Sequence, residues 1–348
     1  MGGEVSLATS ANAESVKSKT VGPKTAWRWI ADCVWNFSAL TICLLAAGAI
    51  ISLFARSHWF FDLAANLRVQ QVIAIGGGAV ITILFRRWRW LAFTAVLLAF
   101  HLPSLSTAWM GQPNANADPD LTIMVVNVLT SNSHHDLVLN QVEAADADVF
   151  AIVELGTPLA NRLRKATAET YPYHAGNSQD RGNFGIGLYS KYPVKDDAIF
   201  VLNEDRIWSI EATVSKDDQN YRIVATHPLP PMGRRKFRSR NQHLNQLVAR
   251  VNEFQQQDRA TPVIVMGDFN LTPWSPLFAD LQQESGLRRS GQGTGLTPTW
   301  YAKPAFPFGL KLDHILISDQ LECTDHKIGN AIGSDHRAVI AGLRYVEQ

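Results

Sequence analysis

Three long apolar runs near the N-terminus limit how this chain of 348 residues can fold more than any other feature of its sequence. They extend from Val34 to Phe54, from Val69 to Phe85 and from Trp90 to Trp109, and they contain no Asp, Glu, Lys or Arg. A helix of about 20 apolar residues crosses the hydrocarbon core of a bilayer. We therefore interpret residues 34–109 as a membrane anchor, with three transmembrane helices expected. A signal peptide is the alternative for the first run, and a buried soluble helix is the alternative for the second.

Basic residues around these runs predict the orientation of the anchor. Residues 1–33 are mostly small and polar, carry four basic side chains and are expected to form a disordered cytoplasmic tail. Arg86, Arg87 and Arg89 separate the second run from the third. Because Lys and Arg favour the cytoplasmic side, three crossings place everything after Trp109 on the extracytoplasmic side of the cell (inner) membrane. With only two crossings, this orientation reverses.

The overall charge and the cysteines exclude few classes of function. The net charge of +1 gives no global electrostatic reason to bind nucleic acid or anionic membranes, so local clusters must carry any such binding. The three cysteines, Cys33, Cys43 and Cys323, fit neither a disulfide framework nor the spacing of a zinc site. The sequence is therefore compatible with a reducing or an oxidising compartment.

After a polar, proline-bearing stretch at residues 110–119, which we interpret as a linker, the pattern becomes that of an α/β domain at residues 120–348. Short runs rich in Val and Ile predict strands at Leu121–Val128, Val149–Val153, Gly185–Ser190, Ile207–Val214, Tyr221–His227, Val263–Gly267, Asp313–Ser318 and Ala338–Tyr345. Amphipathic segments predict helices at His135–Ala145, Pro158–Thr170, Arg238–Phe254 and Pro276–Ser285. Many strands with few helices between them favour two stacked sheets flanked by helices.

Polar side chains gather where these predicted strands end or begin. They are Asn127, Glu154, His227, Asp268, Asn270, Asp313, Asp335 and His336. Each alone is more often a cap or a solvated group than a functional residue. The segment Gly-Asp-Phe-Asn at 267–270 is more specific, because an acid and an amide two residues apart can point the same way from an extended chain.

Taken in order, these motifs resemble the endonuclease/exonuclease/phosphatase superfamily. Its members include pancreatic-type deoxyribonucleases, abasic-site endonucleases, inositol polyphosphate 5-phosphatases and neutral sphingomyelinases. The resemblance rests on Asn127, Glu154, the strand at 185–191, Thr226-His227, Gly267-Asp268-Phe269-Asn270, Leu312-Asp313-His314-Ile315 and Gly333-Ser334-Asp335-His336. It implies a four-layer α/β sandwich of two stacked mixed β-sheets flanked by helices, preceded here by the N-terminal transmembrane helical region.

The resemblance also implies a metal site. Glu154 would bind Mg²⁺, or alternatively Mn²⁺, with help from Asn127 and Asp335. Few protein ligands are expected, because Mg²⁺ keeps several waters and shares phosphate oxygens of the substrate. Val153 stands where many relatives have Gln before the metal-binding Glu, which weakens any assignment to one nuclease subgroup.

Catalytic roles follow from the same resemblance. His336, polarised by Asp313, would activate water as a general base, and Asp268 would help to orient that water. Asn270 and His227 would hydrogen-bond the phosphoryl oxygens as charge develops there.

Further basic residues are candidates for binding substrate phosphate. Arg234, Arg235 and Arg238 lie in a basic stretch directly after the segment that carries His227, and their alternative role is the solvated start of a helix. Arg181 and Asn183 are weaker candidates for the same role. An aromatic loop follows, with Trp300, Tyr301, Phe306 and Phe308, which packs on itself or stacks on a base or a lipid.

The implied function is a membrane-anchored, Mg²⁺-dependent phosphoesterase that hydrolyses a phosphate mono- or diester by metal-assisted in-line attack of water. A metal-dependent nuclease acting on DNA or RNA is the first alternative, and a non-catalytic membrane-tethered binding protein is the second. The substrate, whether a lipid head group, a sugar phosphate or nucleic acid, stays open. The membrane is an expected partner, and no obligate protein partner is expected.

Overall fold

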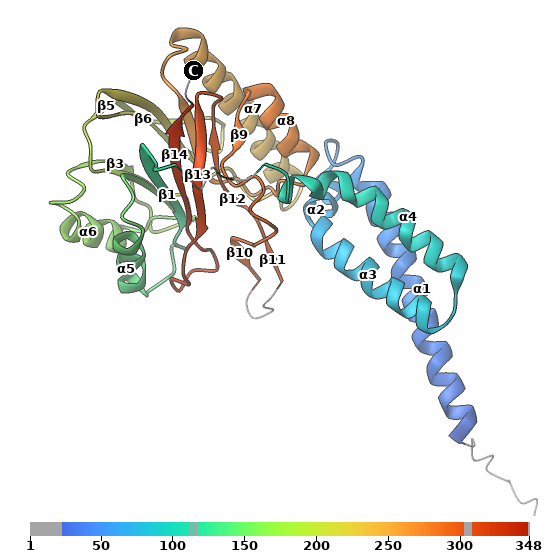
Figure 1. The fold of residues 1–348 in the computed structure, drawn as a ribbon. Coiled ribbons are helices and arrows are strands. Elements are labelled where there is room, and N and C mark those ends of the chain that lie inside the picture. The colour runs from blue at the N-terminus through green and yellow to red at the C-terminus, as the bar shows by residue number, and fades with distance from the viewer. Residues whose placement is uncertain (1–22, 112, 114–116, 303–307, 347–348) are drawn as a thin grey trace, which may run out of the picture.

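The computed structural model describes residues 23–111, 113, 117–302 and 308–346, and it consists of a helical bundle joined to an α/β domain (Figure 1). The bundle contains α1 (Pro23–Ser52), α2 (Trp59–Asn66), α3 (Arg68–Leu84) and α4 (Trp88–Leu105), followed by a short 3₁₀ turn. Residues 23–33, expected to be disordered, are helical, because Pro23 suits a first helical turn and no Gly or Pro interrupts the residues after it. The rest of the predicted tail lies outside the described residues.

Length and composition allow two helices of the bundle to cross a membrane, Ala26–Ser52 and Trp88–Ala108. A third span requires that α2 and α3, which are bent by 62° relative to each other, count as one broken span. Large apolar side chains point outward from the bundle, for example Phe37, Leu84 and Val96, which are 73%, 73% and 65% exposed. An apolar outer surface of this kind suits contact with lipid.

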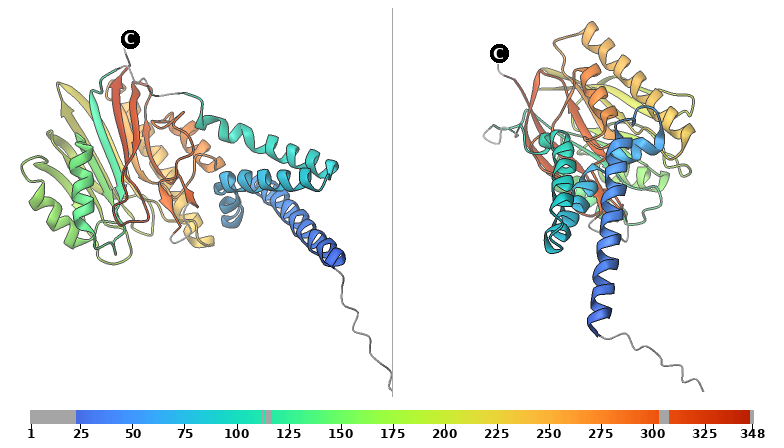
Figure 2. Two further views of the ribbon diagram at one scale, coloured as in Figure 1. Left: turned by 60° about the horizontal axis from the view of Figure 1, so that its bottom comes forward. Right: turned by 90° about the vertical axis from the view of Figure 1, so that its right-hand side faces the viewer.

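The bundle has two chemically different ends. The ends of α1 and α4, together with α2, lie against the α/β domain (Figures 1 and 2). The start of α1 and the turn between α3 and α4, which carries Arg86 and Arg87, lie at the far end. Arg86 and Arg87 are therefore at the end of the bundle opposite the α/β domain, whereas Arg56 and Arg68 are at the end that contacts the domain.

The α/β domain is built on two mixed six-stranded sheets. The first has the order β13-β14-β1-β2-β4-β3, with strands Leu321–Ile328, Val339–Tyr345, Leu121–Asn127, Val149–Val153, Ile186–Ser190 and Tyr173–Asn177. The second has the order β5-β6-β7-β8-β12-β9, with strands Val194–Val201, Trp208–Lys216, Gln219–Thr226, Val263–Asp268, Asp313–Ile317 and Arg288–Arg289. The strands β10 (Trp300–Tyr301) and β11 (Gly309–Leu310) form a small separate pair.

The domain has four layers, because each sheet is apolar on both faces. On β1, Ile123 and Val125 face the second sheet, whereas Met124 and Val126 face the outer helices. Helices α5 (His135–Ala145) and α6 (Thr157–Ala166) cover the first sheet, and α7 (Arg234–Gln257) and α8 (Pro276–Ser285) cover the second. The predicted four-layer α/β sandwich is confirmed.

The strands that the sequence did not reveal lie mainly at the edges of the sheets. Strand β5 has the sequence VKDDAIFV and β13 has LECTDHKI, so both mix charged and apolar residues. An edge strand with exposed positions does not need the continuous apolar run of a strand that is covered on both faces. Helix α7 also begins at Arg234, before the predicted start, directly after Gly233 with its positive φ of 92°.

The bundle packs against the domain through buried polar contacts. Asp62 of α2 and Arg240 of α7 form an ion pair of 2.8 Å in which both side chains are 0% exposed. The backbone N–H of Thr272 donates to Asn66 Oδ1 at 2.7 Å, and Ser275 Oγ lies 3.2 Å from Asp62 Oδ1. Helix α2, which the sequence did not predict, therefore belongs to the structure of the domain as much as to the bundle.

Candidate active site

The ends of four strands and the start of a fifth meet at one edge of the sandwich. Strands β1 and β2 run parallel and end next to each other, as do β7 and β8 in the second sheet. Strand β12 begins opposite the end of β8, with Asp313 paired in register to Asp268. This topology brings together side chains from both sheets: Asn127, Glu154, His227, Asp268, Asp313 and His336.

Asp268 lies at the centre of this group. Its Oδ2 atom is 3.1 Å from Asn127 Nδ2, 3.5 Å from His227 Nε2 and 3.6 Å from His336 Nε2. Its Oδ1 atom accepts the backbone N–H of Asn270 at 2.9 Å. Burial alone would raise the pKa of Asp268, but the positive charges of His336 and His227 hold it well below the usual range. Asp268 is therefore an anion at neutral pH.

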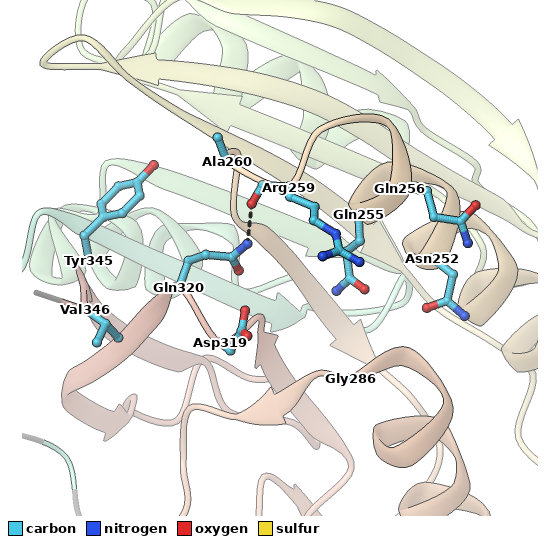
Figure 3. Close-up of a pocket in the computed structure, with 10 residues that line it drawn as sticks. All are labelled: Asn252, Gln255, Gln256, Arg259, Ala260, Gly286, Asp319, Gln320, Tyr345 and Val346. Carbon is cyan, nitrogen blue, oxygen red and sulfur yellow. Dashed lines mark hydrogen bonds between the residues drawn. The ribbon is translucent and has the colours of Figure 1, made fainter. Parts of the chain in front are cut away.

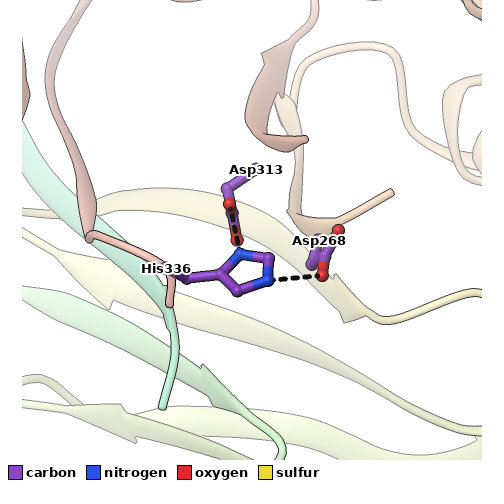
Figure 4. Close-up of side chains that lie close together, drawn as sticks. All are labelled: Asp268, Asp313 and His336. Atoms are coloured by element: carbon purple, nitrogen blue, oxygen red, sulfur yellow. Dashed lines mark hydrogen bonds and ion pairs between the residues drawn. The ribbon is translucent and has the colours of Figure 1, made fainter. Parts of the chain in front are cut away.

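His336 is held from its other side by Asp313. The distance from His336 Nδ1 to Asp313 Oδ2 is 2.8 Å, and both side chains are buried (Figure 4). Burial lowers the pKa of His336, but the carboxylates of Asp313 and Asp268 outweigh burial and raise the pKa to about 10. Because Nδ1 faces Asp313, Nε2 is the atom that faces Asp268 and the site.

Glu154 follows β2 in a left-handed conformation, with φ of 58°, and is buried. Its Oε1 atom accepts from Asn127 Nδ2 at 2.9 Å, and Oε2 lies 3.4 Å from the backbone N of Thr130. Burial raises the pKa of Glu154, while the charge of His227 opposes the rise. Among the described residues, no Lys or Arg pairs with this carboxylate.

A hard cation fits the donor set around Glu154. Carboxylate and amide oxygens are suitable ligands for Mg²⁺, and a buried carboxylate without a cationic partner lacks charge compensation. Asp268, Asp313 and His336 also offer donor atoms within 4.8 Å of one another. However, Asp313 and His336 already bind each other at 2.8 Å. Asn127 turns its amide nitrogen toward Glu154, and its Oδ1 accepts the backbone N–H of Leu129 at 3.0 Å, so Glu154 is the carboxylate that could receive a cation, and Asn127 could join it only after its side-chain amide turns over.

Asp335 and Asn270 are held by neighbours outside this group. Asp335 Oδ2 accepts from the indole N–H of Trp300 at 2.9 Å, which places this carboxylate beside His336. Asn270, with φ of 50°, donates from its side-chain amide to the carbonyl of Pro228 at 3.0 Å. That amide is therefore already occupied by a backbone oxygen, although Asn270 was expected to face phosphate.

The five predicted phosphate-binding residues fall into three groups. Arg234 and Arg238, in the first turns of α7, line a pocket of 490 Å³ together with His58 and Trp59 from the bundle. Arg235 instead pairs with Asp205. Arg181 and Asn183 are exposed in the loop before β4, where the neighbouring Phe184 lies with its ring 5.8 Å from that of His227.

Ser334 and Thr299 have positioning roles that the sequence did not reveal. Ser334 Oγ donates to the carbonyl of Asn127 at 2.9 Å and accepts the N–H of His336 at 3.0 Å. Thr299 Oγ1 accepts the N–H groups of Leu312 and Asp313 at 2.9 and 3.0 Å. Ser334 stands inside the Gly-Ser-Asp-His motif, so that motif was the available signal. Nothing in the sequence around Thr299 indicated its contact.

A separate cleft of 820 Å³ lies at the opposite end of β8. Arg259, Gln320 and Tyr345 are among its lining residues, and Gln320 Nε2 donates to the carbonyl of Arg259 at 2.7 Å (Figure 3). None of the six clustered side chains lines it. We therefore do not assign this cleft as the candidate active site, despite its size.

Residues 124–336 match the family described as "Endonuclease/Exonuclease/phosphatase family", and the chain belongs to this family. Members of the family are hydrolases that act on phosphoester bonds. The match begins after the helical bundle, so the bundle lies outside the family region. No curated protein sequence matches the chain significantly.

Solved structures similar to this chain share its fold. D. rerio TDP2 complexed with a single-strand DNA product has a TM-score of 0.54 at 16% identity, covering 64% of this chain and 98% of that one. The 3′ phosphatase NExo from Neisseria, bound to a product DNA hairpin, has a TM-score of 0.54 at 20% identity, covering 65% and 100%. Beta toxin from Staphylococcus aureus, with bound magnesium ions, has a TM-score of 0.50 at 18% identity, covering 66% and 100%.

Proposed function

We propose that this chain is a membrane-anchored, Mg²⁺-dependent phosphoesterase whose catalytic domain comprises residues 120–348. The observation that carries the proposal is the position of Asp268, which lies within 3.6 Å of nitrogen atoms of Asn127, His227 and His336. A buried anion among two histidines and an amide matches the needs of phosphoryl transfer, where a water must be oriented and negative oxygens must be bound.

Glu154 would hold the Mg²⁺, with Asp335 as a further ligand, and Asn127 would join them through Oδ1 once its side-chain amide turns over from its present contacts with Leu129 and Glu154. When bound, the ion supplies positive charge that neutralises the phosphate. Mn²⁺ is the alternative ion. The cation also compensates the buried charge of Glu154, which His227 and His336 offset only in part and with which no Lys or Arg among the described residues pairs.

Hydrolysis proceeds by in-line attack of water without a covalent intermediate. Asp268 orients the water, and the neutral form of His336 accepts its proton at Nε2 while Nδ1 stays bonded to Asp313. The new bond joins the water oxygen to phosphorus, and the bond from phosphorus to the leaving oxygen breaks. His227 binds a phosphoryl oxygen, as does Asn270 once its side-chain amide leaves the carbonyl of Pro228.

Arg234 and Arg238 bind a further phosphate or head group of the substrate, and Arg181 and Asn183 are weaker candidates for the same role. The first two have no acidic partner among the described residues, and they line a pocket that the bundle helps to form. Arg235, although we expected it to share this role, is already paired with Asp205. The substrate is therefore expected to be an ester that reaches the site next to the membrane, such as a lipid head group or a sugar phosphate.

A phosphoesterase panel on the full-length chain in detergent, with Mg²⁺ or with EDTA, tests the proposal. It includes bis-p-nitrophenyl phosphate, inositol phosphates, phospholipids, and DNA and RNA. We expect hydrolysis that requires the metal and that falls by about 10²-fold or more in each of Glu154→Ala, Asp268→Ala and His336→Ala. Inactivity on every substrate would favour a non-catalytic binding protein, and normal turnover in all three variants would refute the site.

A nuclease is the second candidate, because two proteins of similar fold carry DNA product in their solved structures. Metal-dependent cleavage of plasmid DNA or of RNA, without hydrolysis of the other esters, would favour it. Cleavage of a lipid or sugar phosphate would favour the first candidate.

The catalytic domain is proposed to lie on the extracytoplasmic side of the inner membrane. The support is the position of Arg86 and Arg87 at the end of the bundle away from that domain, together with the preference of such residues for the cytoplasm. Labelling of cells with a membrane-impermeant thiol reagent tests this, with Cys33 and Cys43 replaced by Ser. Ser57→Cys should react from outside and Arg87→Cys should not, and the reverse pattern would place the domain in the cytoplasm.

A further inference from the structure

A cleft of 330 Å³ lies where the helical bundle meets the α/β domain, and we call it the anchor cleft. Its wall on the bundle side includes Arg68 at the start of α3 and Pro103 and Thr107 near the end of α4. On the domain side it includes Trp274, which precedes α8, and Arg289 of β9. None of the clustered active-site residues lines the anchor cleft, so it is a separate site.

Two arginines of the anchor cleft are buried without an acidic partner. Arg68 is 6% exposed and Arg289 is 4% exposed, and neither forms an ion pair among the residues that the structure describes. Arg68 Nε and Arg289 Nη2 have no hydrogen-bond partner within the same described part of the chain. A buried cation without a counter-charge is costly, and an unsatisfied buried donor often marks the place of an ion.

The surroundings of these arginines add positive charge and supply no compensating anion. The residues that line the anchor cleft include no Asp or Glu. A third arginine of the lining, Arg56, is already held by Asp280 through two hydrogen bonds of 2.7 Å. Lys311 is buried near Arg289, and burial together with the charge of Arg289 lowers the pKa of Lys311 to about 7. The lining of the anchor cleft therefore supplies no carboxylate to pair with Arg68 or Arg289.

We propose that the anchor cleft binds a phosphate group through Arg68 and Arg289. The guanidinium group presents a planar fork of donors that matches phosphate, and two such forks bound to one anion satisfy both buried charges. This site goes beyond the proposed hydrolysis, because it lies outside the catalytic cluster and its occupancy needs no turnover.

The head group of an anionic phospholipid is one source of that phosphate. The cleft opens at the domain end of the bundle, where α3 starts and α4 ends, and phospholipid phosphates lie at the ends of membrane-spanning helices. Leu67 and Leu102, next in sequence to Arg68 and Pro103, are 43% and 60% exposed and can contact acyl chains. Free inorganic phosphate, the product of a monoester hydrolase, has the same chemistry and is the second source.

Native mass spectrometry of the full-length chain in detergent, titrated with phosphatidylglycerol or with phosphatidylcholine, tests the lipid source. Thermal unfolding with added inorganic phosphate tests the free anion. We expect saturable binding of phosphatidylglycerol over phosphatidylcholine, weakened about tenfold or more in Arg68→Met and in Arg289→Met. Loss of a phosphate-dependent rise in Tm in the same variants would identify free phosphate as the ligand.

Arg288→Gln is the matched control, because Arg288 neighbours Arg289 but donates to the carbonyl of Leu321 and does not line the cleft. This variant should bind like the wild type. Equal binding in the wild type and in both Met variants would overturn the proposal. So would a wild-type chain that binds neither probe saturably, a result that stands even if the variants do not fold. These readouts do not use hydrolysis, so they are independent of the proposed enzyme activity.

Discussion

The imidazole of His336 lies between two carboxylates, with Nδ1 2.8 Å from Asp313 Oδ2 and Nε2 3.6 Å from Asp268 Oδ2. These charges raise the pKa of His336 to about 10, so the metal-free protein holds this ring protonated at neutral pH. A general base must be deprotonated before it accepts a proton. The carboxylates of Asp313 and Asp268 therefore set the pH above which His336 can act as a base in the proposed reaction. A bound cation, by its positive charge, lowers that pH.

We expect kcat/KM to rise with pH until His336 is neutral. Asp313→Asn removes a charge that raises the pKa of His336, so the rise should occur at lower pH in this variant. Its maximal rate should also fall by about 10²-fold or more, because the imidazolium loses its stabilising partner. Profiles of kcat/KM against pH at saturating Mg²⁺ measure both effects. A rise at the same pH in both proteins would exclude His336 as the base.

Glu154→Gln should weaken Mg²⁺ binding by about tenfold or more, measured by calorimetric titration. Without metal, the same variant should unfold at a higher temperature than the wild type. Burial raises the pKa of Glu154 above its unfolded value, so the ionised carboxylate destabilises the fold once the pH exceeds the unfolded pKa, and Gln carries no such charge. Each kcal/mol regained corresponds to roughly 2–4 °C. Glu143→Gln, at an exposed position, is the control and should change neither property.

Arg234→Gln and Arg238→Gln should raise KM for the preferred substrate by about tenfold each, with kcat nearly unchanged, because these side chains bind substrate away from the reacting atoms. Arg235→Gln provides the matched comparison, since Arg235 is held by Asp205. Steady-state kinetics on the most rapidly hydrolysed substrate of the panel measure KM and kcat for each variant. An equal effect of all three changes would indicate a general loss of positive charge and not a site.

Arg240→Met should destabilise the full-length chain by about 3–5 kcal/mol, because Asp62 is left as a buried, uncompensated charge. The double variant Asp62→Leu with Arg240→Met removes both charges and should recover most of that loss. Thermal unfolding in detergent measures the difference. A single variant as stable as the wild type would show that the ion pair does not join the bundle to the domain in solution.

Gly267→Ala should prevent folding or destabilise the domain by more than about 4 kcal/mol. A Cβ atom at this position would lie 1.8 Å from the carbonyl oxygen of Thr226, because β7 and β8 approach closely just before the site. Expression level and circular dichroism report the outcome. Gly233→Ala is the comparison variant, because a Cβ there meets no atom within 4 Å while Gly233 has φ of 92°. It therefore reports the effect of backbone strain without steric contact.

The sandwich and the positions of the site residues were predictable because central strands appear in a sequence as continuous apolar runs. Strand β2, VFAIV, is buried on both faces and therefore continuously apolar, and the polar residue after it is conspicuous. The same contrast marks Asp268 after β8. The family and the four-layer fold predicted from these motifs are both confirmed.

Contacts between segments far apart in the chain were not predictable from the same patterns. Asp62 stands in a short stretch that resembles a loop between apolar runs, and its partner Arg240 stands in a basic helix start. No periodicity links the two residues. The pairing of Arg235 with Asp205 was not predictable for the same reason.

The active site is divided between the two sheets, and its hydrogen bonds cross from one to the other. Asn127 ends β1 and His336 lies just before β14, both of the first sheet, and their partners Asp268 and Asp313 belong to the second sheet. The relative placement of the sheets is set by the apolar layer between them. The turnover number is therefore expected to depend strongly on how the side chains of that layer pack. Substitutions of one methylene in the interior are expected to slow the enzyme at temperatures where spectroscopy still reports a native fold.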